Sequence, residues 1–185
     1  MQNTLLAQRY AKALFELAVE LNKLEEVKKD MDLLMDTIAE SNEFRQFLVS
    51  PVIRADKKVA VLRGIFLDKV DSITMKFFEL LAKNRREPNL LIIAEEFIVI
   101  YKKHKNITTV TVKTAVSISD RLKKDILERL ARYTGGTIDL VEIVDEKLIG
   151  GFIVSIENEQ YDASLLRTFN RLMKEFEENP YISAI

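Results

Sequence analysis

Apolar side chains recur every three or four positions through the first half of the chain, which is the spacing of one face of an α-helix. Near the N-terminus this face comprises Leu6, Tyr10, Leu14 and Leu17. Similar apolar faces follow, separated by short polar segments or by a proline such as Pro51. We expect helices at about residues 4–21, 24–38, 42–49, 56–67, 70–83 and 87–105. Six short helices with brief connections favour a compact antiparallel bundle.

After Asn106 the pattern changes to the alternation of apolar and polar residues that is typical of half-buried strands. We expect strands at residues 109–118, 138–144 and 148–156, with the last two joined as a hairpin, and helices at about 120–135 and 162–176. The order is then β-α-β-β-α. The sequence therefore predicts a mainly α protein with two domains, a six-helix bundle over residues 1–105 and a small α+β domain over residues 106–185.

Composition narrows the possible functions. The chain has 28 basic and 29 acidic residues and a net charge of −1, which argues against binding to nucleic acid. It has no cysteine and one histidine, so we expect neither a disulfide framework nor a metal site built from several histidines. No apolar run approaches the roughly 18 residues of a membrane span, so we expect no direct membrane insertion. The N-terminus lacks the pattern of a secretory signal, so we expect a cytosolic location.

Candidate catalytic and nucleotide-binding residues are few. Gly135-Gly136 and Gly150-Gly151 do not lead into a helix, as a phosphate-binding loop would require. Adjacent glutamates such as Glu95-Glu96 point in different directions on a helix and do not converge on a substrate. His104 lies in a cationic helix end without a carboxylate beside it. We therefore expect no catalytic residue, no cofactor, no metal and no small-molecule substrate.

Two helices have apolar faces wider than one core contact needs. In the first helix Ala7, Ala11, Phe15 and Ala18 lie directly beside the principal apolar face. The fifth helix leaves only a narrow polar stripe. Either both helices are central in the bundle, or one part of each face forms a groove for an amphipathic helix of a partner. The pattern alone leaves both interpretations open.

Three segments resemble a known family. Residues 9–15 (RYAKALF), the Lys83-Asn84-Arg85 loop, and residues 148–154 (LIGGFIV) followed by 161–165 (YDASL) are similar to the delta subunit of F-type ATP synthases, the oligomycin-sensitivity-conferring protein family. The resemblance extends over essentially the whole chain. One departure is Glu157-Asn158, where the family commonly has Gly-Asp.

The resemblance implies a non-catalytic stator subunit that resists rotor torque. The N-terminal bundle would bind the N-terminal helix of an alpha subunit at the tip of the catalytic head. The C-terminal domain would bind the C-terminal region of the b subunits in the peripheral stalk. The implied location is peripheral, on the cytoplasmic face of a bacterial cell membrane.

The resemblance also implies site residues. Tyr10, Ala13 and Leu80 match positions that the family uses to bind the alpha subunit. We extend this site to residues on the same helical faces, which are Leu6, Leu14, Leu17, Phe77 and Leu81. The family signature residues Gly150, Gly151, Asp162 and Ser164 are expected to be structural, in a close-packed strand and a capped helix. The alternative function is another soluble helical adaptor that binds a different amphipathic helix.

Overall fold

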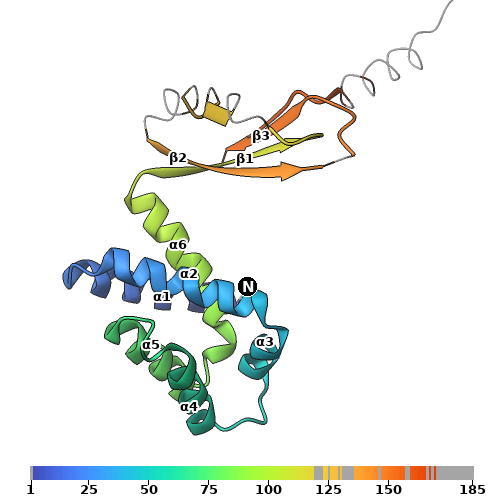
Figure 1. Ribbon diagram of the computed structural model, residues 1–185. Coiled ribbons are helices and arrows are strands. Elements are labelled where there is room, and N and C mark those ends of the chain that lie inside the picture. The colour runs from blue at the N-terminus through green and yellow to red at the C-terminus, as the bar shows by residue number, and fades with distance from the viewer. Residues whose placement is uncertain are drawn as a thin grey trace, which may run out of the picture. The chain divides into compact units, whose positions relative to one another are not determined.

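The computed structural model describes residues 2–118, 123, 124, 126–128, 130, 136–145, 147–156, 159–165, 167 and 169. The chain divides into two compact units, Met1–Lys105 and Asn106–Ile185, and each is described by itself (Figure 1).

The first unit is helical. Its elements are α1 (Gln2–Glu20), α2 (Leu24–Glu40), α3 (Asn42–Val49), α4 (Ala55–Phe66), α5 (Ser72–Lys83), the short 3-10 helix η1 (Glu87–Asn89) and α6 (Leu90–His104). Local sequence explains several boundaries. The side chain of Ser41 accepts a hydrogen bond from the Phe44 N–H and so caps α3. Asn22, Arg85 and Asn106 adopt a positive φ just after α1, α5 and α6, a conformation that commonly ends helices.

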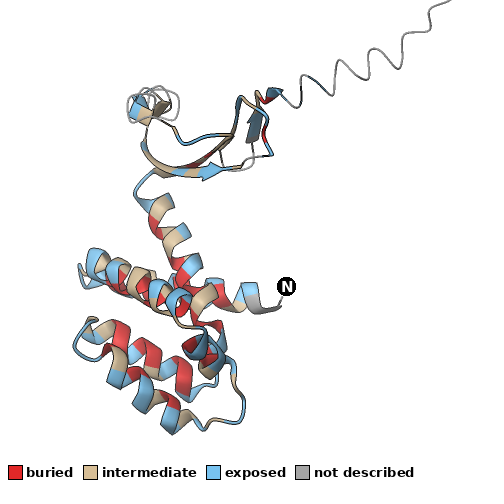
Figure 2. Ribbon diagram, turned by 45° about the vertical axis from the view of Figure 1, so that its right-hand side comes forward, coloured by how far each residue is buried: buried red, intermediate tan, exposed pale blue. Residues whose placement is uncertain are grey.

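The core of the helical unit centres on α6, which packs against α1 and α2. The buried side of α1 is rich in alanine, since Ala7, Ala11 and Ala18 are fully buried. These small side chains allow α1 to approach α6 closely. The buried residues face inward in each helix (Figure 2). The alanine-rich side of α1 is therefore its core side, and the Tyr10–Ala13–Leu17 side is left for other contacts.

Helices α4 and α5 pack against each other as a helical hairpin. A buried lysine joins this hairpin to the rest of the unit. Lys58 of α4, 1% exposed, donates hydrogen bonds to the Leu48 carbonyl at 2.8 Å and to Glu87 Oε1 at 2.6 Å. The lysine thereby connects α4 with the end of α3 and with η1. Breaking such a buried pair is costly, because it leaves one charge without a partner.

The second unit contains a four-stranded sheet of β1 (Ile107–Thr114), β2 (Thr137–Val144), β3 (Phe152–Ile156) and β4 (Glu159–Asp162). The strand order is β2-β1-β3-β4. Strand β1 pairs with β2 in parallel and with β3 antiparallel, and β3 pairs antiparallel with β4. Val110 and Val112 of β1 are 0% and 1% exposed. Among the described residues of the sheet, only β1 contains buried positions, and it has a neighbouring strand on each side.

The expectation of a mainly helical chain with a small sheet is confirmed, but its detail is not. Residues 2–105 contain η1 in addition to six α-helices, and the first strand begins at Ile107 and ends at Thr114. The sheet has a fourth strand, β4, where we expected only the start of a helix. Helical residues occur at 123–130 and 165–169, with gaps, and most of the two helices expected there lies outside the described residues.

The expected hairpin between the second and third strands is wrong. Strand β1 lies between β2 and β3, and the Asp145 N–H at the end of β2 donates to the carbonyl of Thr114 in β1. Proximity in sequence predicts a hairpin between β2 and β3, but they do not pair with each other. The sheet instead places β1 between them, so that β2 pairs with β1 in parallel and β3 pairs with β1 antiparallel.

Candidate partner-binding site

Three observations show how α1 and α5 lie relative to each other. Lys23, just after α1, forms an ion pair of 2.5 Å with Asp71, just before α5. The rings of Tyr10 and Phe77 meet edge to face, with centroids 6.4 Å apart. Leu6, near the start of α1, lines a hollow together with Arg86, just after α5. The two helices therefore run in opposite directions past each other, with Tyr10 and Phe77 between the two ends.

One end of this arrangement is fixed by buried polar groups. Asp30 of α2 accepts hydrogen bonds from the Asp71 N–H at 2.9 Å and from the Thr74 hydroxyl at 2.6 Å. Asp71 in turn caps α5, because its carboxylate accepts from the Ile73 N–H at 2.9 Å. This is the logic of a capping box, except that the second carboxylate comes from another helix. We call Lys23, Asp30, Asp71 and Thr74 the anchored end.

The two carboxylates of the anchored end have opposite pKa shifts. Burial raises the pKa of Asp30, and the hydrogen bonds from Thr74 and from the Asp71 backbone only partly oppose this. The Ile73 N–H and then the Lys23 ammonium lower the pKa of Asp71. The hydrogen bond to Asp71 raises the pKa of Lys23. Both carboxylates serve to position helices, because their hydrogen bonds go to the start of α5.

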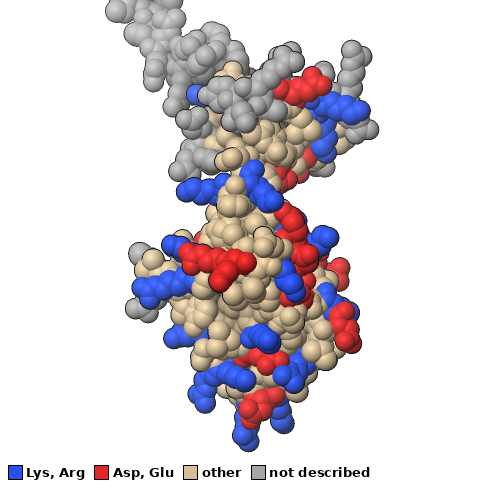
Figure 3. Space-filling view, turned by 90° about the vertical axis from the view of Figure 1, so that its left-hand side faces the viewer, with Lys and Arg blue, Asp and Glu red and all other residues tan. Residues whose placement is uncertain are grey.

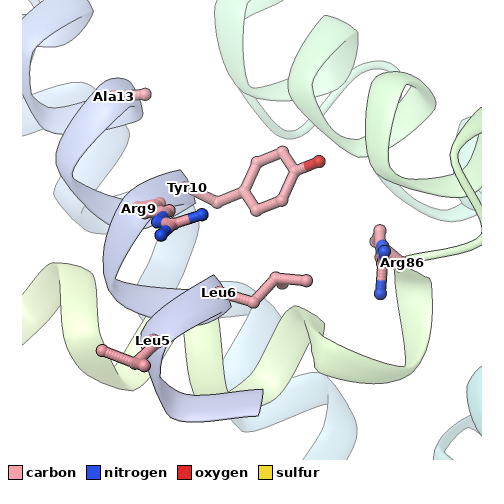
Figure 4. Close-up of a pocket in the computed structure, with 6 residues that line it drawn as sticks. All are labelled: Leu5, Leu6, Arg9, Tyr10, Ala13 and Arg86. Atoms are coloured by element: carbon pink, nitrogen blue, oxygen red, sulfur yellow. The ribbon is translucent and has the colours of Figure 1, made fainter. Parts of the chain in front are cut away.

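The other end contains a hollow of about 560 Å³. It is lined by Leu5, Leu6, Arg9, Tyr10, Ala13 and Arg86. In Figure 4, Tyr10 and Leu6 project from α1 toward the side on which Arg86 lies. We call Leu5, Leu6, Arg9 and Arg86 the open end. It combines apolar surface with two guanidinium groups.

The structure separates the eight residues expected to bind the alpha subunit into two groups. Leu6 and Tyr10 are half-buried, Ala13 is exposed, and Leu17 and Leu80 are 41% and 48% exposed. We call these five residues the α1–α5 surface. They combine apolar character with solvent exposure, as a partner-binding surface requires.

The other three residues lie in the core. Leu14, Phe77 and Leu81 are 2%, 9% and 0% exposed, so they offer almost no surface to a partner. Sharing a helical face did not imply exposure, because α1 and α5 each turn part of that face inward. Phe77 instead packs against the ring of Tyr10 and supports it.

The sequence interpretation missed Leu5, Arg9 and Arg86. Leu5 is 61% exposed and both arginines are exposed. The periodicity of apolar residues selects neither arginine, since Arg9 is a polar residue of the first helix and Arg86 follows the fifth. The signal that could have found them is their position beside the expected groove residues.

The signature residues of the second unit connect two segments, residues 150–151 before β3 and residues 162–167 at and after the end of β4. Gly151 has a φ of 81°, and a Cβ there would collide with the Ala163 carbonyl oxygen. The Leu165 N–H donates to the Gly150 carbonyl at 2.9 Å. Ser164 accepts from the Arg167 N–H at 3.2 Å, as a helix cap does.

Asp162 adds to this connection, because its carboxylate accepts a hydrogen bond from the Ser164 N–H at 2.9 Å. This bond lowers the pKa of Asp162. These contacts connect the start of β3 with the residues that follow β4.

Within the described part of the chain, no group of three or more His, Asp or Glu side chains is placed to hold a metal ion. None of the helices in the described residues is both long and apolar enough to cross a membrane.

Comparisons with known proteins agree with one another. A sequence model of the family described as ATP synthase delta (OSCP) subunit matches residues 6–176. The ATP synthase subunit delta of Christiangramia forsetii is 36% identical over 185 residues, which is 100% of both chains. That of Cytophaga hutchinsonii is 32% identical over 178 residues, 96% of this chain and 97% of the other.

A solved structure shares the fold across both units. One chain of the cryo-EM structure of the Toxoplasma gondii mitochondrial ATP synthase hexamer matches with a TM-score of 0.76 and 25% identity. The match covers 94% of this chain and 98% of that chain.

A helical unit followed by a small mixed sheet is the fold that this chain shares with a chain of an ATP synthase. The chain belongs to the delta (OSCP) subunit family of ATP synthase, which confirms the resemblance seen in the sequence. Members of this family are structural, non-catalytic components of the complex.

Proposed function

We propose that this chain is the stator subunit that connects the catalytic head of an F-type ATP synthase to its peripheral stalk. In this proposal the unit of residues 1–105 binds the N-terminal helix of an alpha subunit. The unit of residues 106–185 binds the C-terminal region of the b subunit. The protein is held peripherally at the cytoplasmic face of a bacterial membrane, where it resists the torque of the rotor.

The observation that carries the proposal is the exposure of the α1–α5 surface. Leu17 and Leu80 are nearly half exposed although both are large and apolar, and Ala13 lies between Tyr10 and Leu17 on the same side of α1. An amphipathic helix presents apolar residues three and four positions apart, which can contact such a row. The half-buried ring of Tyr10 provides an aromatic contact near its middle.

Charge does not compete with this apolar contact. Acidic and basic side chains are interspersed on the helical unit in the face that Figure 3 shows. A contact that must last under mechanical load needs a slow dissociation rate. Most differences in affinity between related interfaces are differences in that rate. Apolar burial suits that requirement better than exposed ion pairs, which contribute about 0–1 kcal/mol each.

The test is a binding measurement with a peptide copied from the N-terminus of an alpha subunit. Leu80→Asp introduces an unpaired charge into the proposed contact. We expect it to weaken binding by about 2–4 kcal/mol, roughly 30- to 1,000-fold. Val99→Asp on α6 is the matched control, because Val99 is 61% exposed on another helix. It should bind the peptide as the wild type does.

Circular dichroism establishes that both variants are folded. Equal affinity of folded Leu80→Asp and Val99→Asp would contradict the proposed site. Equal binding of a scrambled amphipathic peptide would favour a general helical adaptor over a stator protein. A fragment from the C-terminal region of the b subunit should bind Leu80→Asp and the wild type equally, because the proposal assigns that contact to the other unit.

A further inference from the structure

The open end has an excess of positive charge. Arg9 and Lys12 lie in the first part of α1, and Lys83, Arg85 and Arg86 lie at and after the end of α5. The carboxylate next in sequence, Glu87, is buried against Lys58 and does not serve Arg86. The first acidic residue of α1 is Glu16, which is 3.8 Å from Lys12.

Among the described residues, two arginines of the helical unit form ion pairs, whereas Arg9, Arg45, Arg85 and Arg86 have no carboxylate within ion-pair distance. Arg54 pairs with Asp56 at 3.3 Å, and Arg63 pairs with Glu79 at 2.6 Å. Two cations, Arg9 and Arg86, thus line one hollow without an ion-pair partner among the described residues.

The surroundings of these cations would strengthen an ion pair. Leu5, Leu6 and Tyr10 add apolar surface to the hollow, and Leu6 and Tyr10 project toward the side on which Arg86 lies (Figure 4). A carboxylate that enters this hollow with an apolar helix would lose much of its contact with water, and its attraction to arginine would rise accordingly. Arginine is also suited to bind a carboxylate through two parallel hydrogen bonds.

We propose that the helix bound on the α1–α5 surface is acidic at one end, and that its carboxylate binds Arg9 and Arg86 at the open end. This inference rests on the proposed function and adds a requirement to it. The apolar residues of the partner contact Leu17 and Leu80, and its acidic residue lies beyond them, toward Leu6. The partner is therefore an acidic amphipathic helix in which the charge stands at one end of the apolar stripe.

Charge complementarity also fixes the orientation of the bound helix. Its acidic end faces the start of α1, while its other end faces the anchored end, where Lys23 is already paired with Asp71. A helix bound in the reverse direction would leave both arginines without a partner. The open end therefore determines which direction the apolar surface accepts.

The experiment combines charge reversal on both molecules. The probe is the alpha-subunit N-terminal peptide, together with a version in which its acidic residues are replaced by glutamine and one in which they are replaced by arginine. The protein variants are Arg9→Glu and Arg86→Glu. Arg45→Glu on α3 is the matched control. Arg45 is exposed, and this substitution changes the net charge by the same amount at another place.

We expect Arg86→Glu and Arg9→Glu each to weaken binding of the natural peptide by about 10-fold or more, and Arg45→Glu to change it by less than about 3-fold. The arginine version of the peptide should bind Arg86→Glu better than it binds the wild type. The glutamine version should bind the wild type more weakly and with less dependence on salt. Arg9→Gln and Arg86→Gln repeat the test if a glutamate variant does not fold.

The outcomes separate the two proposals. If the wild type binds the peptide but the arginine variants bind like Arg45→Glu, the inference about the open end is overturned and the proposed function stands. If the wild type does not bind any of the peptides, the proposed function itself is overturned. Restored binding between the reversed partners supports both.

Discussion

The two ends of the α1–α5 surface differ in how their charged groups are paired. At the anchored end every charged group has a partner within the chain, since Lys23 meets Asp71 and Asp30 meets Asp71 and Thr74. At the open end Arg9 and Arg86 line a hollow without a described carboxylate beside them. The interactions that order the surface are therefore separate from those that we propose for partner recognition.

This separation has an energetic advantage. A partner that binds a preformed surface does not have to order it, and the entropy of ordering is then lost during folding rather than binding. Each end also depends on a buried polar group outside the surface. Asp30 fixes the start of α5, and Lys58 fixes Glu87, the residue after Arg86.

The largest effect should come from the support of the open end. Lys58→Met leaves Glu87 as a buried carboxylate without its cation, and we expect the free energy of unfolding to fall by about 3–5 kcal/mol. Urea denaturation measures this loss. The double variant Lys58→Met with Glu87→Gln should recover part of it, because the uncompensated charge is gone. A loss in Lys58→Met below about 1 kcal/mol would contradict the importance of this link.

The support of the anchored end should have the next largest effect. Asp30→Ala leaves the Asp71 N–H and the Thr74 hydroxyl without their acceptor, which we expect to cost about 2–4 kcal/mol of stability. Leu34→Ala is the matched control on the same helix, because it removes a fully buried side chain at a similar cost and leaves the anchored end intact.

Peptide affinity distinguishes these two variants. Measured where both are folded, Asp30→Ala should bind the alpha-subunit peptide more weakly than Leu34→Ala does, because only Asp30 positions α5. Equal affinities would mean that Asp30 contributes to stability alone.

Acid should weaken the anchored end through Asp71. The pKa of Asp71 is lowered from 3.8 in the folded state, so its contribution is complete above the unfolded pKa and is lost as pH falls through the folded pKa. Asp30 acts in the opposite sense, since its raised pKa means that protonation relieves the cost of a buried charge. We therefore expect Asp71→Asn to flatten the loss of stability below about pH 4 and Asp30→Asn to steepen it.

Denaturation midpoints of the wild type and both asparagine variants at about pH 5 and about pH 3 test these slopes. The Asp71 assignment fails if Asp71→Asn and the wild type lose the same stability over this range.

The smallest effect belongs to a pair at neither end. Arg63 and Glu79 join α4 to α5 at 2.6 Å, but the arginine side chain is 55% exposed. We expect Arg63→Gln to reduce stability by less than about 1 kcal/mol and to leave peptide affinity unchanged. A change in affinity would mean that the pairing of α4 with α5, and not only the two ends, sets the shape of the surface.

The sequence predicted the helical unit well because its signal is local. The 3-4 spacing located all six helices within a few residues, and Ser41 and Pro51 mark their limits. The spacing could not decide which side of α1 faces the core. Ala7, Ala11 and Ala18 form the core side because small residues permit close packing against α6. The core side of α1 therefore depends on α6, which is far from α1 in the sequence.

The exposure of the candidate site residues could be predicted only in part, for a related reason. Family resemblance selected Tyr10, Ala13 and Leu80, which are all accessible, whereas extension along the helical face added the buried Leu14 and Leu81. Arg86 could not be found from periodicity, since it follows the helix. The sheet was harder still, because alternation predicts strands but not which strands pair.

The order of the strands has a consequence for synthesis on the ribosome. The helical unit is one continuous segment, so it can complete its core while the remainder of the chain is still being made. Strand β1 follows immediately, yet it is an inner strand of the sheet, and its Val110 pairs with Ile156. During translation β1 therefore emerges with both edges unpaired and two valines that have no cover. This interval exposes the nascent chain to aggregation, and a chaperone that shields β1 would act there.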